Sequence, residues 1–248
     1  MLIALLLAGL FLLPRAGVLA LMALIVAIAA YEWGRICGLG PAAAHGYAAG
    51  NLVALGALFF VEPATPAFVI AAAFWLVLVP AWMARGVRAG HQTLLLGAGF
   101  VVLVPPALAM VTLRPLDALL FLAVAWIADT AAYFAGRRWG RRKLAPAISP
   151  GKTWEGAAGG LIAAAAYAMI LSILFAGVQG TRMAAFLGAA ALLVAVSIIG
   201  DLFESAAKRQ AGVKDSGTIL PGHGGMLDRI DSATAVLPVA AMVVPFLK

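Results

Sequence analysis

Residues 201–232 read DLFESAAKRQAGVKDSGTILPGHGGMLDRIDS, and this polar stretch lies between two long apolar runs. Its charged and titratable residues, of both signs, are Asp201, Glu204, Lys208, Arg209, Lys214, Asp215, His223, Asp228, Arg229 and Asp231. A segment of this kind, with several glycines and apolar neighbours, is hard to explain as a solubilising surface. We therefore interpret it as a reaction centre at a bilayer surface, which the hydrophobic runs hold in place.

The composition of the 248-residue chain indicates an integral membrane protein. Hydrophobic residues make up 65% of it and charged residues 11%, whereas soluble domains are about half apolar and roughly a quarter charged. The net charge of +7 is explained by basic cytoplasmic loops, with anionic lipid or nucleotide phosphate as a further attraction. We expect no nucleic-acid partner. The single cysteine, Cys37, excludes an intrachain disulfide.

Apolar runs are interpreted as helices because a backbone in lipid has to satisfy its own hydrogen bonds. Nine such runs follow one another: 2–13, 16–31, 43–61, 66–83, 93–113, 116–135, 156–178, 183–200 and 227–247. The first run is short for a crossing, which leaves eight crossings as the alternative. No lysine or arginine precedes it, so we do not expect a cleaved signal peptide.

These runs predict an all-α fold, a polytopic membrane helix bundle with about nine membrane segments. We expect a single domain over 1–248, in which 1–135 forms the N-terminal helices. Residues 136–248 then form a catalytic half, whose polar loops are 136–155 and 201–231.

The distribution of lysine and arginine predicts the orientation. With nine crossings, one side receives thirteen of them: Arg35, Arg85, Arg88, Arg137, Arg138, Arg141, Arg142, Lys143, Lys152, Lys208, Arg209, Lys214 and Arg229. The other side receives four: Arg15, Arg114, Arg182 and Lys248. The rich side should be cytoplasmic, which places the N-terminus inside. Both polar loops then open onto the cytoplasmic face and can build one site.

The acidic residues suggest a metal site. Asp228 and Asp231 are three residues apart and share a face if the last helix begins near Met226. Paired carboxylates repel each other unless a cation lies between them, and hard oxygen ligands suit Mg²⁺ or Ca²⁺. The competing interpretation is an ordinary first helical turn, where the dipole favours acidic side chains.

Two further carboxylate positions are candidates. On a continued helix, Asp201, Glu204, Ser205 and Lys208 fall on one face, although charges are also common where a helix leaves the membrane. Asp129 lies inside an apolar run, and an intramembrane carboxylate is a functional candidate. Its alternative role is a hydrogen bond between helices.

Basic residues and glycines suggest a site for phosphate. The positions are Lys208, Arg209 and Lys214, which could equally serve as membrane anchors, and the turn around His223, Gly224 and Gly225. Glycines let a backbone approach an anion and present N–H groups to it, although the turn could be a simple connector. Lys152 lies in a GKT sequence that is not a P-loop, because Pro146 stands where its first glycine belongs and no strand is expected before it.

The residues S205-x2-KR-x4-KD-x-G-x2-LPGHGG-x2-DR-x-D231 resemble the signature of the phosphatidate cytidylyltransferases, or CDP-diacylglycerol synthases. The upstream segments 129–133 (DTAAY) and 149–156 (SPGKTWEG) are also similar to family segments, so the resemblance covers roughly the C-terminal half. Gly151 departs from it, because a basic residue is expected there. The N-terminal half offers only a faint echo at 31–33 (YEW).

The resemblance implies the reaction, in which phosphatidic acid attacks the α-phosphate of CTP to give CDP-diacylglycerol and pyrophosphate. It implies Mg²⁺ at Asp201, Asp228 and Asp231, and leaves open a second, monovalent cation such as K⁺. Catalytic candidates are Lys208, Arg209, Lys214, Asp215, His223 and Arg229; substrate-binding candidates are Ser205, Lys152, Gly224 and Gly225; Asp129 and Glu204 are further candidates. The lipid phosphate is already ionised, so no strong general base is needed.

The expected partners are therefore CTP, phosphatidic acid and membrane lipid, with a homodimer left open. We expect a multi-pass protein of the bacterial inner membrane, with its active site on the cytoplasmic side. A cation-coupled transporter is one alternative, but it would place its charges near the midplane on broken helices. A CDP-alcohol phosphotransferase is another, but its Asp-Gly-rich motif is not visible.

Overall fold

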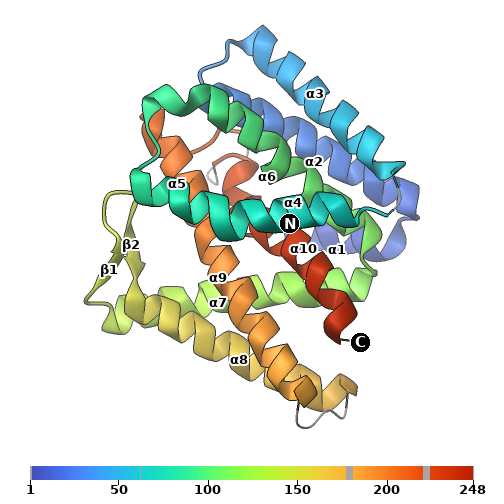
Figure 1. Cartoon of the computed structure of the whole chain (residues 1–248), viewed down its shortest axis with the longest axis vertical. Coiled ribbons are helices and arrows are strands. Elements are labelled where there is room, and N and C mark those ends of the chain that lie inside the picture. Colours follow the sequence, from blue (N-terminus) through green and yellow to red (C-terminus); the bar gives the residue numbers. More distant parts are fainter. Residues whose placement is uncertain (1, 62, 177–180, 220–223, 248) are drawn as a thin grey trace.

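The computed structural model describes residues 2–61, 63–176, 181–219 and 224–247. Helices dominate these residues, which confirms the predicted helical membrane fold (Figure 1). The elements are α1 (Leu2–Leu12), α2 (Arg15–Ile36), α3 (Pro41–Phe59), α4 (Thr65–Ala73), η1 (Phe74–Leu78), α5 (Val79–Arg85), η2 (Ala89–His91), α6 (Gln92–Thr112), α7 (Pro115–Trp139), β1 (Lys143–Ala145), β2 (Ser149–Thr153), α8 (Trp154–Ala176), α9 (Thr181–Gln210) and α10 (Leu227–Leu247).

Eight helical stretches within the described residues are long and apolar enough to cross a membrane. They run from α2 to α10, with α4, η1 and α5 counted together, and the predicted count of about nine agrees with them. The remaining helix, α1, has 11 residues and measures roughly 16 Å at 1.5 Å per residue, about half of a hydrocarbon core. A cytoplasmic N-terminus requires α1 to cross the membrane. The location of the N-terminus therefore stays a prediction.

The third crossing is a continuous helix that contains a π-helical turn, η1. Pro80 lies in the first turn of α5 and has no N–H to donate, so a regular ladder is broken there. The helix continues because the Val79 N–H bonds to Phe74 O, five residues back. Its neighbour α6 is the most buried of the candidate spans among the described residues and forms the centre of the bundle.

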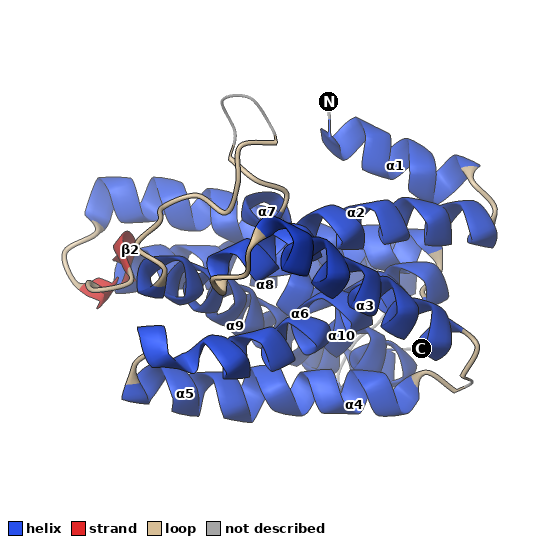
Figure 2. Cartoon of the chain, turned by 90° about the horizontal axis from the view of Figure 1, so that it is seen from above, coloured by secondary structure: helices blue, strands red, loops and turns tan. Residues whose placement is uncertain are grey.

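Two expected loops contain more regular structure than the sequence predicted. Within 136–155, α7 continues to Trp139, and β1 pairs with β2 in an antiparallel two-stranded sheet in which Lys143 lies opposite Thr153. The Glu155 carboxylate closes this hairpin by accepting the N–H groups of Arg141 and Arg142. Strand β1 therefore precedes the GKT sequence, contrary to the expectation, and the red strands lie at one end of the helical body (Figure 2).

The second expected loop, 201–231, is also partly helical. Residues 201–210 complete α9, and residues 227–231 begin α10. A continued helix was anticipated for Asp201 to Lys208, and the i,i+4 ion pair between Glu204 and Lys208 supports it. The connection between α9 and α10 is therefore shorter than predicted, and its described parts, 211–219 and 224–226, are not helical.

Helix α9 is fixed by an aromatic cluster around Phe203, which is fully buried. Its ring lies 5.5–6.1 Å from those of Trp33, Phe74, Trp75 and Trp82. Aromatic pairs at such separations contribute beyond the area that they bury. The cluster anchors the face of α9 next to Glu204 against α2 and the π-helical turn.

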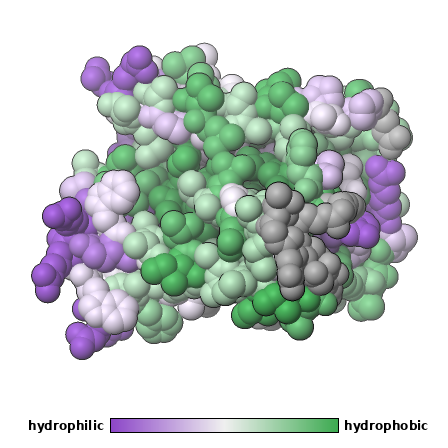
Figure 3. Space-filling model, turned by 60° about the horizontal axis from the view of Figure 1, so that its bottom comes forward, coloured by the Kyte–Doolittle hydropathy of each residue, from purple (hydrophilic) through white to green (hydrophobic). Residues whose placement is uncertain are grey.

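Small residues allow α7 and α8 to approach closely, as in many membrane bundles. A Cβ at Gly156 or Gly160 would lie 2.8 Å from the carbonyl oxygen of Ala132 or Ala128, respectively, so α7 and α8 pack backbone against backbone. The hydropathy surface agrees with a membrane protein. Hydrophobic residues spread across the middle of the face in Figure 3, and hydrophilic residues gather toward its left and right edges.

Candidate active site

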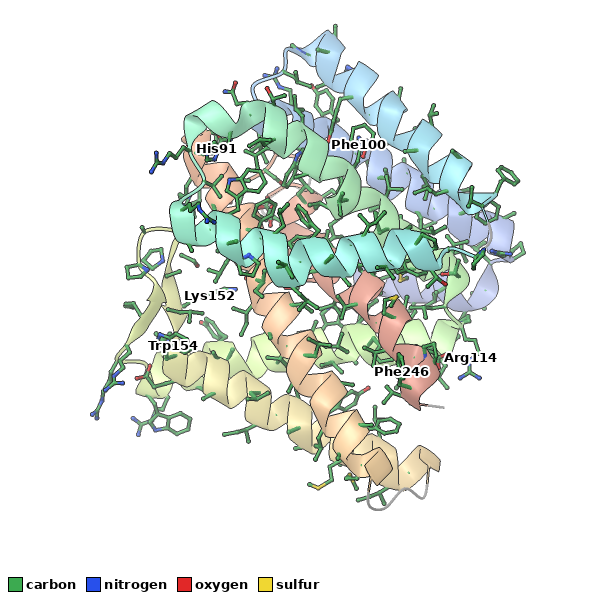
Figure 4. The ribbon with its side chains drawn as sticks, in the orientation of Figure 1. His91, Phe100, Arg114, Lys152, Trp154 and Phe246 are labelled. Atoms are coloured by element: carbon green, nitrogen blue, oxygen red, sulfur yellow. The ribbon has the colours of Figure 1, made fainter. Side chains whose placement is uncertain are left out.

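Carboxylates from three helices meet a lysine in one cavity of about 580 Å³, here called the α7–α10 cavity. Asp129 comes from α7, Asp201 from α9 and Asp231 from α10. Lys152 of β2 pairs with Asp201, with 2.5 Å between Nζ and Oδ2, and lies between the hairpin and α9 (Figure 4). Ser232 Oγ donates to Asp129 Oδ2 at 3.1 Å. The two predicted polar segments therefore do build one site.

The local sequence explains how these groups come together. A Cβ at Gly200 would lie 2.9 Å from both Asp231 O and Ala235 Cβ, so the missing side chain lets α9 lie directly against α10. On the other side, Thr153 Oγ1 accepts the Gly156 N–H at 3.1 Å and caps the start of α8. The cap fixes the end of β2, which carries Lys152 into the cavity.

A second group, here called the Lys208 cluster, lies at the neighbouring turns of α9 and α10. Lys208 Nζ donates to Asp228 Oδ1 at 2.5 Å and lies 3.3 Å from Glu204 Oε1. All three side chains are at most 10% exposed. Neither Glu204 oxygen has a hydrogen-bond partner among the described residues, and Lys208 lies at ion-pair distance from Oε1.

The structure separates the two carboxylates that the sequence paired. Asp231 lines the α7–α10 cavity, whereas Asp228 belongs to the Lys208 cluster and accepts four hydrogen bonds. Its donors are Lys208 Nζ, Ser216 N, Ser216 Oγ and Gly225 N, at 2.5–2.9 Å. Their spacing of three residues does place Asp228 and Asp231 on one side of α10. The two side chains point in different directions, however, so each carboxylate has its own partners. Metal binding by Asp228 stays a prediction.

The predicted anion-binding turn has a different role at Gly225. Its N–H donates to Asp228 Oδ2 at 2.8 Å and so is not offered to a substrate phosphate. A Cβ there would collide with Ser216 Oγ and lie 2.6 Å from both Glu32 carboxylate oxygens. At Gly224, φ is +80°, a region that favours glycine. Close packing against carboxylates therefore explains glycine at these positions, and their contact with substrate stays a prediction.

The other predicted residues are distributed around these two groups. Ser205 Oγ donates to Asp201 Oδ1 at 3.4 Å, next to the α7–α10 cavity. Arg209 bonds to Val213 O on the surface. Lys214, Asp215 and Arg229 are exposed, so the structure does not bring them into the cavity, and His223 lies outside the described residues.

Glu32 of α2 is a site residue that the sequence reasoning missed. It is 2% exposed and accepts hydrogen bonds from Met226 N, Leu227 N and Ser216 Oγ. A carboxylate inside an apolar run was the available signal, as it was for Asp129. The predicted run ended at residue 31 and so left Glu32 outside it, whereas α2 continues to Ile36.

Comparison with known proteins identifies the family of the chain. A family model described as "Cytidylyltransferase family" matches residues 1–247. The chain belongs to the cytidylyltransferase family. The family match also includes the N-terminal helices, where the sequence analysis found a resemblance only at residues 31–33.

Named relatives of this cytidylyltransferase occur in several bacteria. It is 41% identical to a phosphatidate cytidylyltransferase of Pseudomonas aeruginosa over 245 residues, which are 95% of this chain and 90% of that protein. It is 53% identical to the Haemophilus influenzae protein of the same name over 116 residues, 46% of this chain and 40% of the relative. It is 42% identical to the Thermotoga maritima phosphatidate cytidylyltransferase over 135 residues, 53% and 50% of the two chains.

The donors in the α7–α10 cavity of this cytidylyltransferase fit a hard divalent cation. Three carboxylates line the cavity, and the ion pair of Lys152 is with Asp201; a cation between carboxylates would offset their mutual repulsion. Within the described residues, no three His, Cys, Asp or Glu side chains are arranged as a metal site. Mg²⁺ is usually held by one or two carboxylates together with substrate phosphates and water, and its binding at this cavity stays a prediction.

Proposed function

We propose that the protein transfers CMP from CTP to phosphatidic acid, giving CDP-diacylglycerol and pyrophosphate. One observation carries the proposal: the α7–α10 cavity joins the Lys152–Asp201 ion pair to Asp129 and Asp231 beside membrane-spanning helices. A lipid and a nucleotide triphosphate can both reach such a place. The names of the relatives support this substrate pair and do not favour a transporter or a CDP-alcohol phosphotransferase.

The chemistry needs positioning and charge neutralisation rather than a strong base. A phosphate oxygen of phosphatidic acid forms a bond to the α-phosphorus of CTP, and the bond from that phosphorus to the oxygen bridging to the β-phosphate breaks. The released pyrophosphate carries the electron pair away. Because the lipid phosphate is ionised at neutral pH, its oxygen needs no deprotonation, and catalysis consists mainly of holding the two phosphates together.

The basic side chains around the α7–α10 cavity are suited to the triphosphate. Lys152, Arg137 and Lys143 all line it, and each can donate hydrogen bonds to phosphate oxygens. The ion pair with Asp201 directs Lys152 into the cavity. Mg²⁺ held by Asp201 and Asp231, with Asp129 nearby, would neutralise charge that develops on the leaving pyrophosphate. A second, monovalent cation such as K⁺ would occupy the same acidic region.

An activity assay tests the proposal. Purified protein receives phosphatidic acid and labelled CTP, with and without Mg²⁺, beside Asp201→Asn and Asp231→Asn. We expect CDP-diacylglycerol from the wild type and a loss of about a hundredfold or more in either variant, since each removes a charge that faces the phosphates. Asp117→Asn, in an ion pair with Arg114 at the start of α7, is the control and should stay active. Wild-type turnover in both site variants would refute the cavity as the active site.

We further propose that the protein lies in the bacterial inner membrane and that this site opens on the cytoplasmic side. The candidate spans Thr65–Arg85, Gln92–Thr112 and Pro115–Trp139 lie between residues 63 and 143. Three crossings place these two residues on opposite sides of the membrane. In a Cys37→Ser background, Lys143→Cys should react with an impermeant maleimide only after cells are opened, and Pro63→Cys should react in intact cells. The reverse pattern would contradict the orientation. A homodimer remains a prediction, which cross-linking in detergent can test.

A further inference from the structure

Glu32 connects the N-terminal half of the protein to the start of α10. Its Oε1 accepts the Met226 N–H at 3.0 Å, and its Oε2 accepts the Leu227 N–H at 3.0 Å. The Ser216 hydroxyl donates to the same Oε2 at 3.1 Å. These bonds join residues more than 180 positions apart in the chain, and the carboxylate is almost completely shielded from water.

The connecting segment is shaped to admit this carboxylate. A Cβ at Gly217 would lie 2.5 Å from Glu32 Oε1, and one at Gly225 would lie 2.6 Å from both oxygens. A side chain at either position would force the Glu32 carboxylate to shift away from its hydrogen-bond donors, so glycine on both sides preserves these bonds. A buried charge is costly unless it is fully hydrogen-bonded, and the segment supplies donors from two backbone N–H groups and one hydroxyl.

The bonds of Glu32 lead directly into the Lys208 cluster. Ser216 Oγ lies within hydrogen-bond distance of both Glu32 Oε2 and Asp228 Oδ2, so the two carboxylates share one hydroxyl. Met226 and Leu227 begin the helix that carries Asp228 and, one turn later, Asp231. Removing the Glu32 carboxylate therefore frees the first turn of α10 and, with it, one wall of the α7–α10 cavity.

The start of α10 is consequently not an open anion site. Free N–H groups at a helix N-terminus ordinarily attract phosphate. Here Glu32 accepts two of them and Asp228 accepts the preceding Gly225 N–H. These three N–H groups are therefore not free for a substrate phosphate, whereas the basic side chains of the cavity can donate to one.

We propose that Glu32 is a positioning residue, which fixes Ser216, Met226 and Leu227 and the direction of α10 so that Asp231 faces Asp201 across the cavity. It acts through the Met226 and Leu227 N–H groups and through Ser216, without touching the substrate. The kinetic part of this inference rests on the proposed function, whereas its structural part does not.

The test compares Glu32→Gln and Glu32→Ala with the wild type by hydrogen exchange and by kinetics. Glutamine has nearly the size of glutamate, but one of the two carboxylate oxygens is replaced by an NH₂ group. This group donates hydrogen bonds and therefore cannot accept the backbone N–H that faces it. We expect amide protection at 226 and 227 to fall by about tenfold or more in Glu32→Gln, and further in Glu32→Ala. The value of kcat/KM for CTP should fall by about tenfold or more, mostly through kcat, because the nucleotide-contacting side chains remain.

Asn51→Ala is the matched control. Asn51 is fully buried in α3, and its amide donates to Tyr47 O in the same helix. It should lower the melting temperature while leaving kcat/KM within about threefold and protection at 226 and 227 unchanged. Should Glu32→Gln not fold, Ser216→Ala removes only the shared hydroxyl and provides the same readouts with smaller expected changes.

The outcomes separate the two proposals. Unchanged amide protection at 226 and 227 in Glu32→Gln would overturn the positioning role. A loss of protection spread over the whole protein in Glu32→Gln, together with an equal loss of kcat/KM in Asn51→Ala, would also overturn it. Absence of CDP-diacylglycerol synthesis by the wild type would refute the proposed function and leave the exchange result as the test of Glu32. Local loss of protection with lower kcat supports both.

Discussion

Lys208→Met is expected to destabilise the protein strongly, because it removes the cation from between two buried carboxylates. Lys208 Nζ lies 2.5 Å from Asp228 Oδ1 and 3.3 Å from Glu204 Oε1. Removing one partner of a buried ion pair typically costs about 3–5 kcal/mol. Asp228 keeps three other donors, from Ser216 and Gly225, so the unpaired charge falls on Glu204. We therefore expect the lower end, about 3 kcal/mol.

Thermal unfolding in detergent measures this effect. For a chain of this size each kcal/mol corresponds to roughly 2–4 °C, so about 3 kcal/mol predicts a fall of about 6–12 °C in Tm. Lys143→Met on the exposed strand β1 is the matched control and should change stability by at most about 0.5 kcal/mol. Adding Glu204→Gln to Lys208→Met should recover about half of the loss, because it removes the unpaired buried charge. If Lys208→Met has the same Tm as the control, or if adding Glu204→Gln recovers no stability, the assignment of Lys208 as the counter-charge of Glu204 and Asp228 is wrong.

Further expected outcomes concern single positions. Gly225→Ala should cost about 1–3 kcal/mol because its Cβ meets buried side chains, whereas Gly46→Ala, with open space at that position in α3, should gain about 0.5–1 kcal/mol; chemical denaturation distinguishes the two. Lys152→Met removes the partner of Asp201 and should raise KM for CTP by about tenfold or more in steady-state assays; an unchanged KM would exclude a nucleotide contact. Burial raises the pKa of the Cys37 thiol to about 12, so the unreactive protonated form persists well above neutral pH, and maleimide labelling at pH 8 should be slow until the protein is denatured. Fast labelling of folded protein would contradict that burial.

Local chemistry explains which features of the site could be predicted. The i,i+4 spacing alone placed Glu204 within reach of Lys208, and Asp201 within reach of Ser205. The same reasoning placed Asp228 and Asp231 on one face but could not tell where each carboxylate points. Hydrogen-bond donors from Ser216 and Gly225 decide that for Asp228, and they lie on a segment without periodicity.

The hairpin was missed for a related reason. Residues 136–155 are rich in charge and glycine, which predicts a loop, and no apolar alternation marks β1 or β2. The strands form because Glu155 accepts the Arg141 and Arg142 N–H groups and thereby closes the hairpin. Such a bond depends on the position of α8, which the local sequence does not specify.

The amino-acid sequence by itself determined the class of protein, the number and approximate ends of its apolar helices, and the chemical character of its two polar segments. These properties follow from composition and from the hydrogen-bond demand of a backbone in lipid, both of which are local. Only the tertiary structure decided which carboxylates share a cavity, and that Glu32 from the second helix holds the start of the last one. Those choices depend on close helix approach at glycines such as Gly200 and on donors far apart in the chain, which become neighbours only when the bundle is assembled.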